Sequence, residues 1–212
     1  MARVTEVSSP RARRIRVRLD DGSEYVLSES LFHRKPLMVG ADIDASEFSR
    51  WILLHQYQPA LNKAVSLLAC RPCSKAEISR KLAYAGYSSE TVEMVLYKLE
   101  KAKLLDDRDF AQQWVRYRSD SRFGPRRIVQ ELKLKGVSEE DISTSLEGLD
   151  EDEMMNQAIT LAEKKLRHES MEEPVRKLRI KIVNSIVRRG FDWEVARKAT
   201  DTVLREAGLD AD

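Results

Sequence analysis

The sequence lacks long apolar runs and contains few cysteines, histidines, glycines and prolines. Its 212 residues include 2 cysteines, 3 histidines, 8 glycines and 6 prolines. No apolar run approaches the roughly 20 residues that span a bilayer, and none follows the basic amino terminus as it would in a secretory signal. We therefore expect a cytoplasmic protein without a membrane partner.

Cys70 and Cys73 form a single C-x-x-C pair. A zinc site would need more ligands, and neither a second cysteine pair nor a histidine lies at zinc-finger spacing. A redox pair normally opens a helix after a strand, whereas Pro72 interrupts a predicted helix here. We expect no metal or redox site, with Cys73 packed on Ile78 and Cys70 filling the core.

Motifs of common catalytic sites are also missing. The chain has no phosphate-binding or dinucleotide-binding glycine motif, no zinc-protease motif and no nucleophile elbow. Its histidines, His33, His55 and His168, lie far apart without neighbours that suggest a catalytic triad. The sequence predicts a protein that is not an enzyme and has no catalytic residues and no cofactor.

A short pattern occurs three times along the chain. An apolar residue is followed after four positions by another, after four more by glycine, and then by an apolar or aromatic residue. This spacing keeps two side chains on one helix face, and glycine readily takes the left-handed conformation that ends a helix. The copies recur at intervals of about 50 residues, which indicates a tandem repeat. They are Ile78, Leu82, Gly86 and Tyr87; Ile128, Leu132, Gly136 and Val137; and Ile182, Ile186, Gly190 and Phe191.

We predict a mainly α-helical chain in which three tandem three-helix units form an elongated, curved molecule after a small β-hairpin region. In the first unit we expect a helix over 60–70, a second with a capping box between Ser74 and Glu77, and a third over 88–99. The third unit opens with an expected helix around 156–167. The expected domains are 1–58, with a basic arm, hairpin and short helices, and the repeats 59–107, 108–152 and 153–212.

The hairpin is predicted from alternation of apolar residues and arginines. Ile15, Val17 and Leu19 alternate with arginines, the segment 20–23 supplies a turn, and Tyr25 resumes an apolar run. A two-residue loop and a longer loop would place Tyr25 on opposite faces, so the register stays open. The arginines fit either a nucleic-acid arm or a charged edge strand that discourages aggregation.

Acidic residues gather between Ser138 and Glu153. Clustered carboxylates can bind Mg²⁺ as in nucleases, but three of these residues fall in the opening turn of a predicted helix, where the helix dipole favours negative charge. We therefore favour a helix start followed by an acidic linker.

Basic residues form the more suggestive pattern, although the formal net charge is only +2. On the middle helix of the third unit, Lys177, Lys181 and Arg188 fall in one stripe away from the apolar face. We expect this stripe to face nucleic acid or an acidic protein surface, and a solvated helix face is the alternative. In the second unit the candidate contacts are Arg116, Arg118, Arg122, Arg126, Arg127 and Lys133.

Aromatic residues are interleaved with the basic residues of the second unit, a composition typical of phosphate-contacting surfaces with stacking groups. Trp114 falls on the apolar face with Phe110 and is expected in the core. Tyr117 and Phe123 are the aromatics that we expect to be free for stacking.

Together these segments resemble the RecX family, the bacterial regulators of the RecA recombinase. The run from Ala64 to Leu82, followed by Gly86 and Tyr87, is similar to the opening signature of that family. The resemblance covers about 60–203, while 1–10 match nothing. It continues through Leu104-Leu105-Asp106-Asp107, Phe110-Ala111, Val115-Arg116, Arg118, Gly124-Pro125, Ile128, Glu131-Leu132, Lys135-Gly136-Val137 and Arg188-Arg189-Gly190-Phe191.

The resemblance implies a regulator whose three-helix units lie in the groove of the RecA filament on single-stranded DNA. Such binding lowers the ATPase and strand-exchange activities of RecA and limits filament growth, in recombination, DNA repair and the SOS response. The expected partners are RecA and its filament, with DNA itself as a further one. The basic residues suit either the bound strand or acidic patches on RecA.

Two other classes of protein also consist of short helices. A helix-turn-helix transcription factor would need a base-reading helix, whereas the third helix of the first unit carries Glu90, Glu93 and Glu100. A helical-repeat scaffold that binds DNA or protein and is unrelated to RecA is the main alternative. We expect a monomer, because no unpaired heptad seam is evident.

Overall fold

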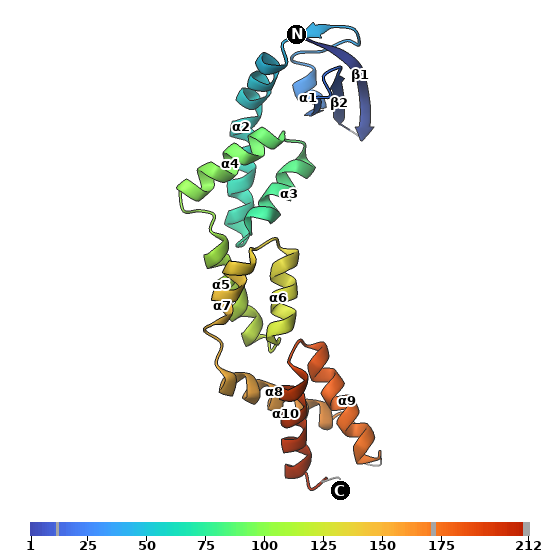
Figure 1. Cartoon of the computed structure of the whole chain (residues 1–212), viewed down its shortest axis with the longest axis vertical. Coiled ribbons are helices and arrows are strands. Elements are labelled where there is room, and N and C mark those ends of the chain that lie inside the picture. The colour runs from blue at the N-terminus through green and yellow to red at the C-terminus, as the bar shows by residue number, and fades with distance from the viewer. Residues whose placement is uncertain (12, 171–172, 210–212) are drawn as a thin grey trace. The chain divides into compact units, whose positions relative to one another are not determined.

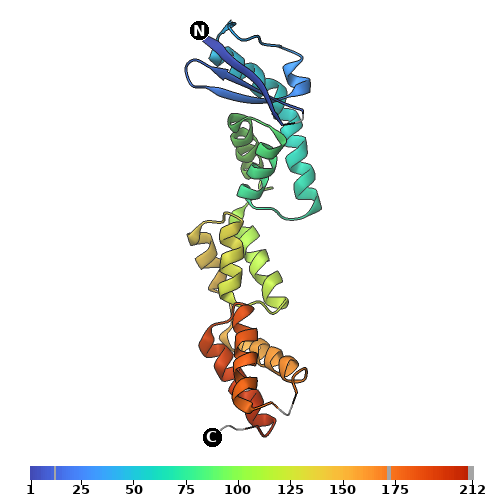
Figure 2. The same ribbon diagram turned by 90° about the vertical axis from the view of Figure 1, so that its right-hand side faces the viewer.

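The structure is a computed structural model that describes residues 1–11, 13–170 and 173–209. The chain divides into two compact units, Met1–Asp106 and Asp107–Asp212. Figures 1 and 2 show the elements from two sides. In the first unit they are β1 (Ala2–Arg11), β2 (Arg14–Leu19), β3 (Glu24–Ser28), α1 (Glu29–Phe32), β4 (Asp42–Ile43), α2 (Ala45–Cys70), α3 (Lys75–Ala85) and α4 (Ser89–Lys101).

The regular elements of the second unit, within its described residues 107–170 and 173–209, are all helices. Two groups of three consecutive helices each enclose a core of their own. The helices are α5 (Asp107–Asp120), α6 (Pro125–Leu134) and α7 (Glu139–Leu146), followed by α8 (Glu151–Leu166), α9 (Val175–Arg188) and α10 (Trp193–Glu206). With the separate core of α2 to α4 in the first unit, three helical groups confirm a mainly helical chain built of repeated three-helix units.

The expected hairpin is formed by β2 and β3. Val17 lies opposite Tyr25 and Ile15 opposite Leu27, so the loop spans the four residues 20–23 and the longer-loop register is the one adopted. Leu27 packs with Leu31, Phe48 and Ile52, which brings the sheet onto α1 and the start of α2. The sheet is thus stabilised by the helices that follow it, as a marginal isolated hairpin requires.

The amino-terminal segment is not an arm, as the sequence had led us to expect, but a strand. Strand β1 pairs antiparallel with β2, and its first residues pair with β4, which gives the strand order β3-β2-β1-β4. The buried Ala2 and Val4 belong to the small core of this sheet. Irregular pairing between Val4 and Glu6 and between Ser8 and Arg11 breaks the alternation by which a strand is identified in a sequence.

Helix α2 corrects a second expectation. It runs without a break from Ala45 to Cys70 with Pro59 inside it, so the predicted helix 60–70 is only its second half. The expected boundary between 58 and 59 therefore lies within a helix. Pro59 is exposed, and the carbonyl of His55 that loses its helical partner can be hydrated there.

All three repeat glycines end a helix as predicted. Gly86, Gly136 and Gly190 have φ angles of +86°, +77° and +94°. The amide of Tyr87 donates to the carbonyl of Leu82 at 3.2 Å, and that of Val137 to Leu132 at the same distance, as in a Schellman motif. The capping box between Ser74 and Glu77 is also present at the start of α3.

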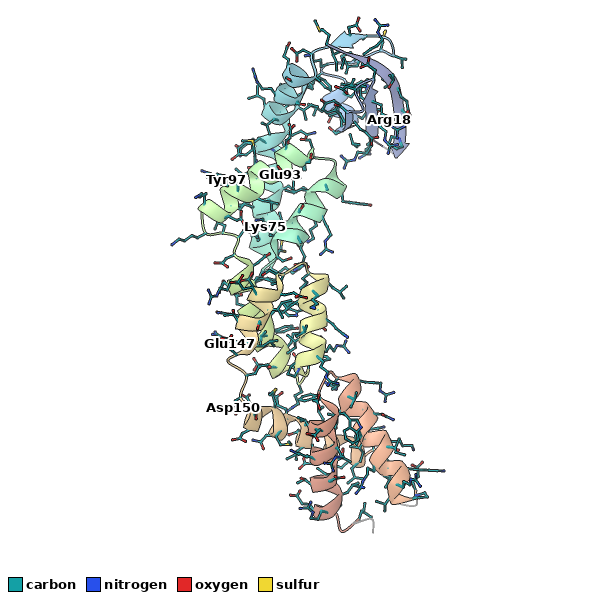
Figure 3. The ribbon with its side chains drawn as sticks, viewed as in Figure 1. Arg18, Lys75, Glu93, Tyr97, Glu147 and Asp150 are labelled. Carbon is teal, nitrogen blue, oxygen red and sulfur yellow. The ribbon has the colours of Figure 1, made fainter. Side chains whose placement is uncertain are left out.

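The acidic stretch belongs to helix starts more fully than expected. Residues 139–141 form the first turn of α7, Asp150 caps α8, and the next three acidic residues form its first turn. Figure 3 labels Glu147 and Asp150 between these two helices. Helix α8 begins at Glu151 rather than near residue 156, and the expected boundary between 152 and 153 lies in its first turn.

Candidate basic interface

The candidate basic residues all lie in the second unit, on three helices and one turn. Arg116 and Arg118 are on α5, and Arg122 follows it with a left-handed φ of +57°. The remaining candidates lie on α6 (Arg126, Arg127 and Lys133) and on α9 (Lys177, Lys181 and Arg188).

Arg118 is held inside the fold and not presented to a partner. Its side chain is 15% exposed and forms an ion pair with Glu131. The guanidinium carbon lies 3.9 Å from the ring centroid of Phe123 and 5.7 Å from that of Trp114. A guanidinium over an aromatic face adds an electrostatic attraction to the packing, so Arg118 joins α5 to α6.

Glu131 is the acceptor around which this cluster is built. Besides Arg118 it receives Arg127 Nε at 3.2 Å and the indole Nε1 of Trp114 at 3.2 Å. Burial acts to raise the pKa of Glu131, but the hydrogen bonds from Arg118 and Arg127 outweigh it and hold that pKa below its ordinary value. The carboxylate therefore stays charged at neutral pH and fixes both arginines.

The start of α6 is capped by the end of α9. The N-cap of α6, Gly124, has no side chain, and its amide donates to the carbonyl of Arg189 at 2.9 Å while that of Arg126 donates to Gly190 at 3.0 Å. We call this contact the α9–α6 joint; Figure 2 shows the two helices meeting end to end. Since these amides already have partners, they are not available to a phosphate in the way a free helix start is.

The α9–α6 joint leaves no room for side chains. A Cβ atom on Gly124 would lie 2.3 Å from the carbonyl carbon of Gly190, and one on Gly190 would lie 2.4 Å from the Cβ of Arg127. Arg126 forms an ion pair with Asp192, the N-cap of α10, across the same joint. Arg126 and Arg127 therefore have structural partners already.

Two lysines of the candidate set are also paired. Lys133 Nζ lies 2.8 Å from Glu139 Oε1, and this hydrogen bond lowers the pKa of Glu139. Lys181 Nζ contacts Glu173 Oε1 at 2.6 Å and Glu169 Oε2 at 3.0 Å, and these hydrogen bonds raise the pKa of Lys181. Both lysines are exposed enough for a partner to reach them, but their charges are already offset by neighbouring carboxylates.

Four candidates are exposed and form no ion pair with any residue that the structure describes: Arg116, Arg122, Lys177 and Arg188. Arg116 lines a hollow of about 320 Å³ between α5, α7 and α8 that also includes Asp120, Asp150 and Glu153. Its surroundings are therefore partly acidic. Arg122, Lys177 and Arg188 are the basic candidates most available to a polyanion.

The aromatic residues agree with the sequence only in part. Trp114 packs on the α5–α7 core as expected, and Tyr117 is 60% exposed. Phe123, expected to be free for stacking, instead lies under Arg118, Arg127 and Arg189, the last at 5.4 Å. Arg189 was missed as a member of this cluster, because only the fold brings it beside a residue 66 positions earlier.

The residues that the structure describes contain no group of three or more His, Cys, Asp or Glu side chains placed to hold a metal ion. Cys73 is buried beside Ile78 as expected, whereas Cys70 is exposed and does not fill the core. Within those same ranges, no helix is both long and apolar enough to cross a bilayer.

Comparison with known proteins identifies two of the helical groups. Residues 60–99 match the family model described as "RecX, first three-helix domain", and residues 106–146 match "RecX, second three-helix domain". The chain is 37% identical over 161 residues to "Regulatory protein RecX" of Mycobacterium sp. (strain JLS), covering 74% of this chain and 84% of that protein. It is 39% identical over 141 residues to the protein of the same name from Pelodictyon phaeoclathratiforme, covering 66% and 86%.

Solved structures agree with these sequence matches. "Crystal structure of regulatory protein RecX" superposes with a TM-score of 0.65 at 26% identity over 95% of this chain and 100% of that chain. "Crystal structure of RecX from Lactobacillus salivarius" gives 0.61 at 24% identity, covering 74% and 99%, and supports the fold alone. The chain belongs to the RecX family of regulatory proteins.

Proposed function

We propose that this protein binds RecA and its filament on single-stranded DNA, and lowers the ATPase, filament extension and strand exchange of RecA. Membership of the RecX family is the observation that carries this proposal. The family models match consecutive three-helix groups of the kind that bind through extended surfaces and need no catalytic residue.

Of the nine basic residues considered, we propose that Arg122, Lys177 and Arg188 contribute most to this binding. Each is exposed, and no described residue neutralises its charge. Arg118, Arg126 and Arg127 instead hold the fold together, so their substitution would confuse lost binding with lost structure.

The test is ATP hydrolysis by RecA on single-stranded DNA, with this protein titrated from far below to equal the RecA concentration. RecA should come from the same host. We expect strong inhibition at substoichiometric amounts, because a bound regulator would block filament growth. No inhibition would contradict the proposal and favour a helical-repeat scaffold unrelated to RecA.

A charge-reversed variant locates the contact. Replacing Arg122, Lys177 and Arg188 with glutamate should raise the concentration for half inhibition by about tenfold or more, because opposing charges at an interface weaken association. The control variant carries glutamate at Lys164, Lys198 and Arg205, which are also exposed and change the net charge equally. Equal losses in both variants would show that total charge, and not this surface, decides the affinity.

Salt dependence then separates the two kinds of partner surface. Contacts to phosphates release counterions, so the affinity should fall steeply as salt rises if the three residues meet the DNA strand. A weaker dependence, with the same loss in the variant, would assign them to an acidic surface of RecA.

A further inference from the structure

A second basic surface lies in the first unit, which contains none of the nine basic candidates described above. A hollow of about 780 Å³ opens between β2, α2 and α3, and we call it the α2–α3 hollow. Its charged lining consists of Arg14, Lys63, Arg80 and Lys81, and no acidic residue lines it. Such a concentration of one charge attracts an anionic ligand although the whole chain is nearly neutral.

The rest of the lining is apolar or aromatic. Leu67, Ala85 and Tyr87 are half-buried there, and Tyr84 is 79% exposed beside them. A hollow that joins apolar side chains to a charged rim is suited to a ligand with an apolar group and negative charges around it. Aromatic side chains are also the residues that most often anchor protein interfaces.

One wall of the α2–α3 hollow is rigid. Arg14 Nη2 donates to the carbonyl of Tyr84 at 3.1 Å, so a residue of the sheet caps the end of α3. A Cβ atom on Gly86 would lie 1.4 Å from Arg14 Nη1, so glycine is needed both for the left-handed turn and for this contact. Arg14 is therefore held in place before any ligand arrives, which reduces the entropy that its ordering would cost on binding.

Lys63 and Lys81 remain available to a ligand. Neither forms an ion pair with the residues described in 1–11, 13–170 and 173–209, and Lys63 is exposed. The acidic residue nearest in sequence on α3, Glu77, is engaged by Arg71 at 3.1 Å. The available positive charge of this surface therefore comes from Lys63 and Lys81.

We propose that the α2–α3 hollow binds an acidic peptide segment of a partner protein, with one aromatic or large aliphatic side chain against Tyr84 and Leu67 and carboxylates against Lys63 and Lys81. Charge complementarity selects the acidic segment, and the apolar lining selects a peptide side chain over a bare polyanion. This inference does not depend on the proposed action on RecA.

The test uses the full-length protein without RecA. The probe is a fluorescein-labelled peptide of alternating aspartate and phenylalanine, and its binding is followed by fluorescence anisotropy. A second peptide has serine in place of every phenylalanine, and a labelled oligothymidylate represents single-stranded DNA. We expect the phenylalanine peptide to bind at least about tenfold more tightly than the serine peptide, as a buried aromatic anchor requires.

Variants place the binding in the hollow. The double substitution Lys63→Glu with Lys81→Glu should weaken binding of the phenylalanine peptide by about tenfold or more. Tyr84→Ala should weaken it to a similar extent. The controls are Lys98→Glu with Lys101→Glu and Tyr97→Ala, which alter exposed residues of α4; Figure 3 labels Tyr97 on that helix. Thermal unfolding of each variant checks that the fold is retained.

Three results would overturn the proposal. The first is absence of peptide binding, and the second is an equal loss of peptide affinity in the hollow and control variants. The third is a loss of affinity in the hollow variants that is confined to the oligothymidylate. The last result would assign the hollow to nucleic acid.

Discussion

At the scale of single residues, charge pairing decides which basic side chains can meet a partner. Arg118 and Arg188 look alike in the sequence, yet one is 15% exposed against Glu131 and the other is exposed without an ion-pair partner among the described residues. Arginine is well suited to the first role because its planar guanidinium can pair with a carboxylate and stack on a ring at the same time. An arginine can thus either stabilise the fold through an internal ion pair or remain available to a binding partner.

Glu131 should make the stability of the second unit depend on acid pH. Its pKa is depressed in the folded protein, so its stabilising effect is present above its unfolded pKa of about 4.3 and is lost as the pH falls through the folded pKa. Glu131→Gln should lower the free energy of unfolding at pH 7 by about 1–2 kcal/mol. It should also flatten the decline of stability below pH 5.

Urea denaturation of both proteins at pH 7 and pH 4 measures this effect. Glu147→Gln is a suitable control, because Glu147 is exposed and forms no ion pair with a described residue. If the free energies of unfolding of wild type and Glu131→Gln differed equally at both pH values, the depressed pKa of Glu131 would not be the cause of the acid sensitivity.

At the scale of elements, the residues at helix ends determine where most helices of the repeats begin and end. Gly86, Gly136 and Gly190 each stop a helix, and serine or aspartate starts the helices that follow them. In the α9–α6 joint the carbonyls at one helix end satisfy the amides at another helix start. Backbone groups that would otherwise need water or a side chain are thereby paired between repeats.

Gly190→Ala should disrupt the α9–α6 joint. Alanine would have to adopt a φ of +94° and would press its Cβ against Arg127, so we expect a loss of about 2–4 kcal/mol in the free energy of unfolding. Gly208→Ala is the matched control, because Gly208 also has a positive φ, +70°, but its Cβ would meet nothing within 4 Å.

Denaturation monitored by circular dichroism compares the two alanine variants. The control should lose only the cost of the left-handed conformation, about 1–2 kcal/mol. Equal losses would mean that backbone conformation alone, and not the close approach of the two helices, accounts for the effect.

The sequence predicted these elements well where local chemistry determines them. Caps, glycine stops and the apolar spacing of four are short-range signals, and they predicted the capping box of α3 and the glycine that ends the middle helix of each repeat. Strand β1 and the continuous α2 were missed because tertiary contacts override local signals there. Irregular pairing hides the alternation of β1, and exposure lets α2 accommodate Pro59.

The candidate basic interface could be predicted as a composition and, on α9, as a stripe of one helix face, but not as a set of available charges. The sequence shows that arginines and lysines are dense in the second and third repeats, but ion pairs such as Arg126 with Asp192 join residues far apart in the chain. The cluster over Phe123 and the α2–α3 hollow are likewise formed by residues that are far apart in the chain. Pairing and concavity are properties of the fold, and one sequence without its structure does not reveal them.

At the scale of the whole molecule, the chain consists of two compact units of about equal size. Each has its own hydrophobic cores, and each is long enough to fold as a domain. The second unit carries all nine basic candidates, whereas the α2–α3 hollow belongs to the first. The two proposed binding activities are therefore assigned to separable parts of the chain.

A fragment of residues 107–212 should fold without the rest of the protein. We expect helical circular dichroism and a cooperative thermal transition, because the cores of α5–α7 and α8–α10 are made entirely by residues of this unit. Gly190→Ala should lower the melting temperature of the fragment, as we expect it to do in the full chain. A fragment without a cooperative transition would show that the second unit depends on the first for its stability.

The α9–α6 joint also bears on how such a repeat protein tolerates sequence change. Its central contacts use main-chain atoms and two glycines, and Arg126 with Asp192 is the ion pair described across it, so most side chains on the outer helix faces do not take part in it. Mutations can therefore alter the charge of one repeat while leaving its attachment to the next intact. A library that randomises the other exposed positions of α6 and α9 but keeps Gly124, Arg126, Arg127 and Gly190 should yield many folded proteins with new binding preferences.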